Sequence, residues 1–268
     1  MAKAAKGDIR VGIGGWTFEP WRGAFYPDGL AQKRELEYAS RAVTAIEVNG
    51  TYYGSQKPAT FASWAAQVPD GFVFTLKASR YCTNRKVLAE AGESIDRFVS
   101  QGITELGDKL GPILWQFMGT KKLDLEDFGA FLKLLPEKQD GIALRHAIEP
   151  RHESFRDPAF IALARKANVA VVIADSTEHP QIADVTGDFV YARLQDAQDD
   201  IETGYDAAAL DRWATVAKEW AAGGSPQGFA YSAPDDPAGK QARDVFVFMI
   251  NGAKRRAPAA AKALIGRL

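Results

Sequence analysis

The sequence lacks the features that mark secreted and membrane-bound proteins. Its 268 residues include one cysteine, Cys82, which rules out an intramolecular disulfide and suits a reducing compartment. No apolar run approaches the roughly 18 residues that a membrane helix requires. The start, MAKAAKGDIR, has no apolar segment of the kind found in secretory signals. We therefore expect a cytoplasmic protein with no membrane partner.

The sequence also has little histidine and no excess charge of one sign. Lys plus Arg (33) nearly balances Asp plus Glu (34), so no strong overall field attracts nucleic acid. The three histidines, His146, His152 and His179, stand in no metal-ligand spacing. We predict no metal site and no cofactor, although Mg²⁺ held by carboxylates stays open as an alternative.

Short β-rich runs alternate with longer helical patterns along the chain. An open doubly wound sheet is the rival architecture, but residues 12–16, GIGGW, lack the G-x-G-x-x-G phosphate turn. Eight strands alternating with helices instead predict an α/β fold, a (β/α)₈ TIM-type barrel in one domain over residues 1–268. The expected strands span residues 9–13, 45–48, 72–76, 113–117, 142–148, 170–174, 189–192 and 245–250.

Amphipathic segments fill the intervals between these runs. Apolar residues share one helical face over 95–110 and again over 125–135. Asp157 and Asp206 are expected N-caps of two further helices. Residues 175–188 are too short and broken for a full sixth helix, and 228–243 predict an insertion or an extra hairpin before the last strand. Residues 1–8 are expected to form a flexible tail.

Polar residues end nearly every expected strand. The carboxyl ends of barrel strands face the active site, and side chains alternate across a strand, so these residues should converge at the barrel mouth while Ile46, Val48 and Ile148 face the helices. A single charge at a strand end is more often a structural ion pair, but a whole ring is costly unless it is paired or used. The set is Glu47, Asn49, Lys77, Gln116, Glu149, Arg151, Asp175, Arg193 and Asn251.

These residue types predict distinct roles. Lys77, Arg151 and Arg193 can hold an anionic group such as phosphate or carboxylate. The catalytic candidates are Glu47, Glu149 and Asp175. Because Arg151 should keep Glu149 ionised and lower its pKa, Glu47 or Asp175 is better suited to proton transfer.

Aromatic residues cluster after the first two strands. Trp16, Trp21, Tyr52 and Tyr53 can wall the pocket and stack on a sugar ring or a base. The alternative is a hydrophobic flap on the barrel rim, which we favour for residues 25–27, and the two alternatives are even for Trp16 and Trp21.

An ordered set of short motifs resembles one known family. The motifs are GIGGW at 12–16, W-x-G-x-FYP at 21–27, EVNGTYY at 47–53, F-x-F-x-LK at 72–77, L-x-QF at 114–117, IE-x-RH at 148–152, Asp175, Y-x-R at 191–193 and Asn251. On these motifs the chain resembles the YecE-like family, domain of unknown function 72. The resemblance implies a TIM barrel and names a pocket, but the family has no established reaction.

The chain departs from the family pattern at several positions. Residues 13–14 replace the usual Thr-Ser, Asn84 replaces a histidine, and residues 195–196 replace His-Gly. Of the usual paired asparagines after the last strand only Asn251 remains. A mechanism that relies on histidine is therefore less favoured here than in other members.

Three functions remain open from the sequence. We favour an enzyme, a hydrolase or lyase acting on a small anionic, ring-containing substrate such as a sugar phosphate or nucleotide derivative. Nucleic-acid binding or repair is an alternative that rests on Arg80, Arg85, Lys86 and residues 254–256. A small-molecule sensor without catalysis is the third. Cys82 is not favoured as a nucleophile, because no histidine base neighbours it.

Overall fold

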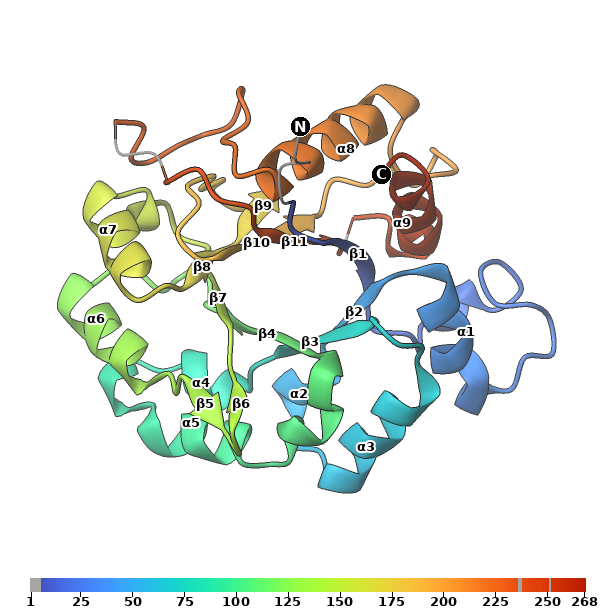
Figure 1. Ribbon diagram of the computed structural model, residues 1–268, viewed down its shortest axis with the longest axis horizontal. Coiled ribbons are helices and arrows are strands. Elements are labelled where there is room, and N and C mark those ends of the chain that lie inside the picture. The colour runs from blue at the N-terminus through green and yellow to red at the C-terminus, as the bar shows by residue number, and fades with distance from the viewer. Residues whose placement is uncertain (1–5, 236–237, 251) are drawn as a thin grey trace, which may run out of the picture.

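The computed structural model describes residues 6–235, 238–250 and 252–268, and its main feature is a ring of parallel strands surrounded by helices (Figure 1). The sheet order is β8-β7-β4-β3-β2-β1-β11-β10-β9. Because β8 and β9 are separated in the chain only by Val172, they are two parts of one strand, and the sheet closes as the predicted eight-stranded barrel. The strands are β1 Ile9–Gly14, β2 Ala45–Val48, β3 Val73–Lys77, β4 Leu110–Gln116, β7 His146–Glu149, β8 Ala170–Val171, β9 Ile173–Asp175, β10 Phe189–Leu194 and β11 Asp244–Met249.

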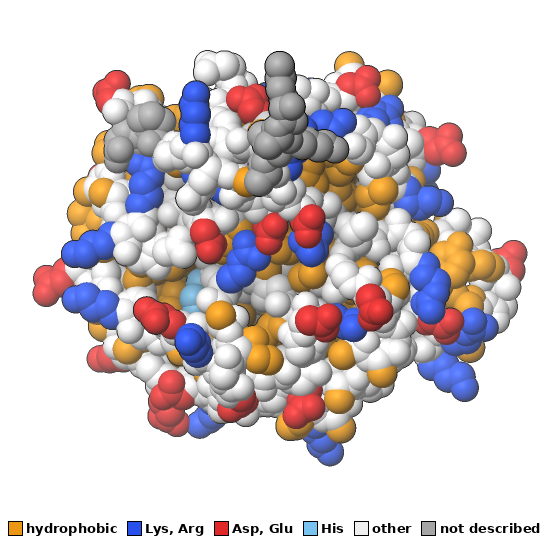
Figure 2. Space-filling model, viewed as in Figure 1, with side chains coloured by type: hydrophobic (Ala, Val, Ile, Leu, Met, Phe, Trp, Pro, Cys, Tyr) orange, Lys and Arg blue, Asp and Glu red, His pale blue; other side chains and the backbone are white. Residues whose placement is uncertain are grey.

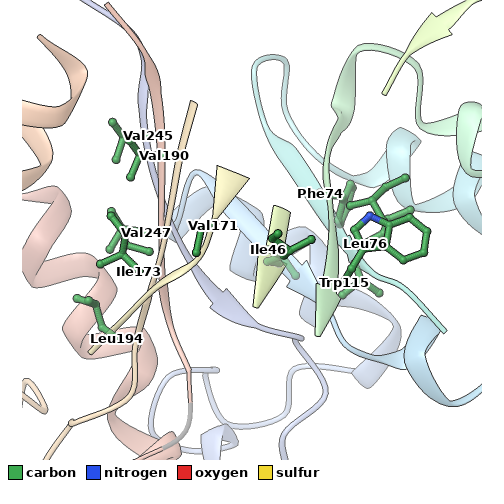
Figure 3. Close-up of a cluster of buried hydrophobic side chains, with 14 of the residues drawn as sticks. Ile46, Phe74, Leu76, Trp115, Val171, Ile173, Val190, Leu194, Val245 and Val247 are labelled. Carbon is green, nitrogen blue, oxygen red and sulfur yellow. The ribbon is translucent and has the colours of Figure 1, made fainter. Parts of the chain in front are cut away.

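Side chains alternate between the two faces of the barrel wall. One hydrophobic cluster lies between the strands and the helices and includes Ile46, Val48 and Ile148, as predicted. Figure 3 shows other members of this outer cluster, such as Trp115 and Val247, directed from the strands toward the surrounding helices. A second cluster, which contains Leu114, Phe189 and Phe248, comes from the alternate positions and fills the barrel interior.

The helices cover the outside of the ring, and α7 and α8 begin at aspartate caps. Asp157 and Asp206 accept backbone hydrogen bonds from Ala159 and Ala209, which confirms both expected N-caps. The helices are α1 Glu35–Ala42, α2 Gly50–Tyr53, α3 Pro58–Gln67, α4 Arg80–Thr83, α5 Gly92–Val99, α6 Leu125–Leu134, α7 Pro158–Lys166, α8 Ala207–Ala221 and α9 Ala257–Ile265.

Two expected elements were too long. The helix expected over 95–110 ends at Val99, because Gly102 has φ +100° and breaks the helical path. A 3₁₀ segment, Ile103–Lys109, follows, and Leu110 already starts β4. The strand expected over 142–148 is divided in two, because its first residues pair in a separate hairpin.

The split arises from a tight turn at Asp140 and Gly141, both with positive φ. This turn pairs β5 Lys138–Gln139 with β6 Ile142–Ala143 in an antiparallel hairpin. The barrel strand β7 therefore begins only at His146.

An irregular segment replaces the sixth helix, as expected. The described residues between β9 and β10 contain no helix, and they are covered by the insertion that precedes β11. Ala183 donates to the carbonyl of Ala230, and Asp184 accepts from the backbone of Ser232 and Ala233. No strand forms within the described part of 228–243, so the extra-hairpin alternative is wrong and the insertion packs as an irregular cover.

The first described residues are attached to the barrel, and the barrel surface carries charges of both signs. Residues 7–8 of the expected tail are tied to the barrel, since Gly7 donates to Ala221 and Asp8 to the carboxylate of Asp244. On the face seen in Figure 2, acidic and basic side chains alternate around a central hollow, and neither sign forms a large field. Among the described residues, no helix has the length and apolar character needed to cross a bilayer.

Candidate functional site

Polar side chains from five different strands meet inside the barrel at its carboxyl end. All are buried, and their neighbours along each strand belong to the outer cluster, so alternation directs them inward. We call this set the polar ring: Glu47 on β2, Lys77 on β3, Gln116 on β4, Glu149 on β7 and Arg193 on β10. The structure thus brings together five of the residues singled out in the sequence.

Arg193 connects the two carboxylates of the polar ring. Its Nε and Nη2 donate to Glu47 at 3.1 and 3.0 Å, and its Nη1 donates to both oxygens of Glu149 at 2.8 and 2.7 Å. Burial alone would lower the pKa of Arg193, but the two carboxylates raise it above its ordinary value. The expectation that Arg193 holds a substrate anion is corrected, because its guanidinium already bridges two acids.

Glu47 is satisfied by neighbours on every side. Besides Arg193 it accepts from the Tyr191 hydroxyl at 2.8 Å and from Asn49 Nδ2 at 3.2 Å. Burial, and then the charge of Glu47, raises the pKa of Tyr191 well above its ordinary value, so Tyr191 stays a donor. Four hydrogen bonds, two from Arg193 and one each from Tyr191 and Asn49, therefore fix the position of the Glu47 carboxyl group.

Glu149 is the second buried carboxylate of the polar ring. It accepts from Gln116 Nε2 at 2.6 Å and from Arg151 Nη2 at 3.2 Å. Burial would raise the pKa of Glu149, but Arg193 and Arg151 outweigh it and lower the pKa to about 2. The prediction that Arg151 keeps this carboxylate ionised is confirmed, and Glu149 cannot serve as a general acid near neutrality.

Lys77 is the member of the polar ring without a polar partner. Its side chain is 8% exposed, yet its ammonium makes no hydrogen bond or ion pair with any described residue. Its Nζ lies 4.3 Å from the centre of the Tyr52 ring. Burial, and then the charge of Arg193, lowers the pKa of Lys77 to about 8. A buried amine with this pKa and no acceptor is available to a ligand.

Two further residues approach this site, and neither was singled out as a site residue from the sequence. His179, partly buried, is close enough to Arg151 and Glu149 for their charges to act on it; burial and Arg151 lower its pKa below the ordinary 6.5. Gln195 lies two residues after Arg193, just past the end of β10, and its Nε2 is buried without a hydrogen-bond partner among the described residues. Alternation places neither residue, because Gln195 lies beyond the end of β10 and His179 lies in an irregular loop.

Asp175 is not part of the polar ring. Its register partner Leu194 belongs to the outer cluster, so the Asp175 side chain also points away from the barrel interior. There it accepts from the Tyr205 hydroxyl at 3.3 Å, while burial and the charge of Asp196 raise its pKa. The expected grouping of Asp175 with Glu47 and Glu149 is therefore wrong, because β9 presents Ala174, not Asp175, to the interior.

The aromatic cover is smaller than expected. Trp21 is fully buried in a flap with Phe25 and Tyr26, and its Nε1 donates to the carbonyl of Lys254. Trp16 packs edge-on against Trp64 of α3 with ring centres 5.2 Å apart. The flap alternative therefore holds for Trp21, whose ring has no exposed face left for a substrate, whereas the role of the partly buried Trp16 stays a prediction.

The tyrosines after β2 remain beside the polar ring. Tyr52 lies against Lys77 and accepts from Asn84 Nδ2 at 3.0 Å, and Tyr53 is 68% exposed next to it. Asn251 lies outside the described residues. Burial raises the pKa of Cys82 to about 12, so this thiol is not a ready nucleophile.

A cavity lies at the opposite end of the barrel. It has a volume of about 1030 Å³ and is bordered by the first residues of three strands, His146, Phe189 and Asp244. His146 is satisfied there by Trp115 and the carbonyl of Pro136. The described residues bring together no cluster of three or more metal-binding side chains. Glu47 and Glu149 instead face the cation of Arg193.

Comparison with known proteins identifies relatives of the same architecture. A family model described as "Protein of unknown function DUF72" matches residues 10–268. A DUF72 family protein of Thermotoga maritima has a TM-score of 0.70 at 21% identity, covering 96% of this chain and 97% of its own. One from Enterococcus faecalis has a TM-score of 0.67 at 19% identity, covering 99% and 100%.

A solved structure outside the DUF72 family also has a similar fold. A fusion protein of a xylose isomerase-like TIM barrel with 4-hydroxyphenylpyruvate dioxygenase has a TM-score of 0.51 at 16% identity, covering 97% of this chain and 42% of its own. A search of curated proteins found no match. These structural similarities, all under 25% identity, describe the fold.

Proposed function

This chain belongs to the DUF72 family, and from that premise we propose that it is an enzyme, a hydrolase or lyase, with its site at the polar ring. Active sites of TIM-barrel enzymes are built at the carboxyl ends of the strands, where the polar ring lies. The substrate class we propose is a small anionic compound such as a sugar phosphate or nucleotide derivative. We also propose a cytoplasmic location, in keeping with the single cysteine.

The observation that carries this proposal is the unpartnered ammonium of Lys77. Three cations, Lys77, Arg151 and Arg193, face two carboxylates, which leaves one positive charge in a buried setting. Because Arg193 bridges both carboxylates, we propose that the anion is received by Lys77 together with the Nη1 of Arg151, whose other two nitrogens donate to Glu149. The orphan amide of Gln195 offers a further donor.

Fewer residues support the proposal that the substrate contains a ring. With Trp21 buried in the flap, it rests mainly on Tyr52 and Tyr53. Aromatic faces add contact area to ring-shaped ligands at low cost in side-chain entropy. His179 is the proton acceptor we propose, because its lowered pKa leaves the imidazole neutral at pH 7.

Binding of inorganic phosphate tests the proposal directly. We expect phosphate to raise the thermal midpoint of the native protein and to do so far less in Lys77→Met. Lys166→Met is the matched control, since Lys166 is exposed at the end of α7. An equal phosphate effect in all three proteins contradicts the proposed anion site.

The two alternatives make different predictions. The cations proposed for nucleic-acid binding are largely engaged: Arg85 bonds to Ser94, and Arg255 pairs with Asp199 at 2.6 Å. Binding to DNA that falls steeply with added salt would favour that alternative. A sensor shares the same site as an enzyme, so the distinction is product formation from a library of sugar phosphates and nucleotides.

A further inference from the structure

The surroundings of Lys77 set it apart from a structural lysine. Its carbonyl accepts from the Thr51 hydroxyl at 2.7 Å, and the following residue, Ala78, donates to Leu114 at 2.9 Å, so the backbone at the end of β3 is held firmly. The side chain then lies against Tyr52 with its nitrogen free of any acceptor among the described residues. The amine is therefore held in position, but it makes no hydrogen bond or ion pair with the described residues around it.

The two buried carboxylates do not require Lys77. Glu47 accepts from Arg193, Tyr191 and Asn49, and Glu149 accepts from Arg193, Arg151 and Gln116. Neither carboxylate accepts a hydrogen bond from Lys77. A lysine that neutralised these acids would be expected in contact with one of them.

We propose that Lys77 is a covalent catalytic residue whose amine forms a Schiff base with an aldehyde or ketone carbon of an anionic substrate; this rests on the proposed function. The neutral amine attacks the carbonyl carbon, a C–N bond forms, and the C=O electron pair moves to oxygen, which takes up a proton. The carbinolamine then loses water to give the imine. One water is released, and no oxidant or reductant takes part.

This chemistry favours the lyase half of the proposed function. A protonated imine accepts the electron pair of a carbon–carbon bond broken at the adjacent carbon, which leaves an enamine on Lys77. The departing fragment becomes a carbonyl compound as its hydroxyl proton passes to a base, for which His179 is the neutral candidate. Glu47 and Glu149 stabilise the cationic imine by their charge.

The ionisation of Lys77 supports the same role. At pH 7 an amine with a pKa of about 8 is neutral in about one molecule in ten, against about one in 3000 for an ordinary lysine. Attack on a carbonyl requires the neutral form. Burial lowers the pKa of Lys77 and so raises the fraction of molecules in which the amine can act as a nucleophile.

Reductive trapping tests the inference. The full chain is incubated at pH 7 with pyridoxal 5′-phosphate, an anionic aldehyde, and reduced with borohydride, and labelled peptides are quantified by mass spectrometry. We expect Lys77 to be labelled at least about tenfold faster than exposed Lys166, and inorganic phosphate to slow that labelling. Lys77→Arg keeps the positive charge, so it should bind phosphate but lose the fast label.

The outcomes separate the inference from the proposed function. Phosphate binding with Lys77 labelled no faster than Lys166 overturns the Schiff-base role and leaves the anion site standing. Fast labelling by uncharged propionaldehyde without any phosphate binding supports the amine and refutes the anion site. The pH profile is a second readout: the labelling rate of Lys77 should level off near pH 8, whereas that of Lys166 keeps rising; parallel profiles overturn the proposal.

Discussion

At the scale of single residues, the ion pairs of Arg193 dominate the site. Replacing Arg193 by methionine leaves Glu47 and Glu149 buried without their shared cation, and breaking such a pair costs about 3–5 kcal/mol. We expect Arg193→Met to lower the free energy of unfolding by about that amount in urea denaturation. Arg97→Met is the control, because its exposed pair with Glu93 contributes under about 0.5 kcal/mol. Equal effects of the two substitutions would contradict the assignment.

The acidity of Glu149 predicts a dependence of stability on pH. Its folded pKa of about 2 lies below its ordinary value of 4.5, so in this window the unfolded chain takes up a proton that the folded protein does not. The stability contributed by Glu149 is complete above about pH 4.5 and is lost as pH falls toward 2, about 3 kcal/mol in all. Urea midpoints between pH 5 and 2 measure this loss. The slope should be shallower in Glu149→Gln, and an unchanged slope would refute the prediction.

The sequence predicted the inward position of the five polar-ring residues but not the ion pairs that Arg193 makes with two of them. Alternation along β2 and β7 correctly turned Glu47 and Glu149 inward, with Ile46 and Ile148 outward. It could not reveal that Arg193 reaches both acids, because that contact joins strands far apart in the chain. Asp175 failed for a simpler reason, since a strand end alone does not fix which face a residue occupies.

At the scale of elements, the sequence predicted the features that depend on interactions between residues close together in the chain. The N-caps at Asp157 and Asp206 were predictable because a carboxylate accepting first-turn N–H groups is a local interaction. Element ends were less predictable: the apolar face over 95–110 continues past Gly102 although the backbone does not. The insertion before β11 is held by hydrogen bonds to residues 181–184, which are 48 or 49 positions away in the chain, and a short sequence window cannot show this.

The cap of α8 gives the prediction at this scale. Asp206 Oδ1 accepts from the backbone of Ala209 at 2.7 Å at the start of this 15-residue helix, whose Leu210, Trp213 and Trp220 are buried. Asp206→Ala should lower the free energy of unfolding by about 1 kcal/mol. Thermal denaturation provides the measurement, with the exposed loop variant Asp200→Ala as control. A cap role is refuted if both variants unfold at the same temperature.

At the scale of the whole molecule, we propose separate tasks for the two ends of the barrel. At the amino end Arg145 donates to Asp244 at 2.9 Å and lies 4.5 Å from the Phe189 ring, joining the starts of β7, β10 and β11. The polar ring occupies the carboxyl end of the same strands. In TIM barrels the amino end serves stability and the carboxyl end serves function.

This division can be tested with one substitution at the amino end. Arg145→Met removes partly exposed ion pairs with Asp244 and Asp188 and cation–π contacts with two phenylalanine rings, so we expect a loss of about 1–2 kcal/mol in unfolding free energy. The labelling rate of Lys77 and its protection by phosphate should stay unchanged in the folded variant, because no contact of Arg145 reaches the polar ring among the described residues. Lys77→Met should show the reverse pattern, with weakened phosphate binding and a small change in stability. If Arg145→Met slowed the labelling of Lys77 while the protein stayed folded, the two ends would be coupled through the strands and the ordinary division of a barrel would not apply to this chain.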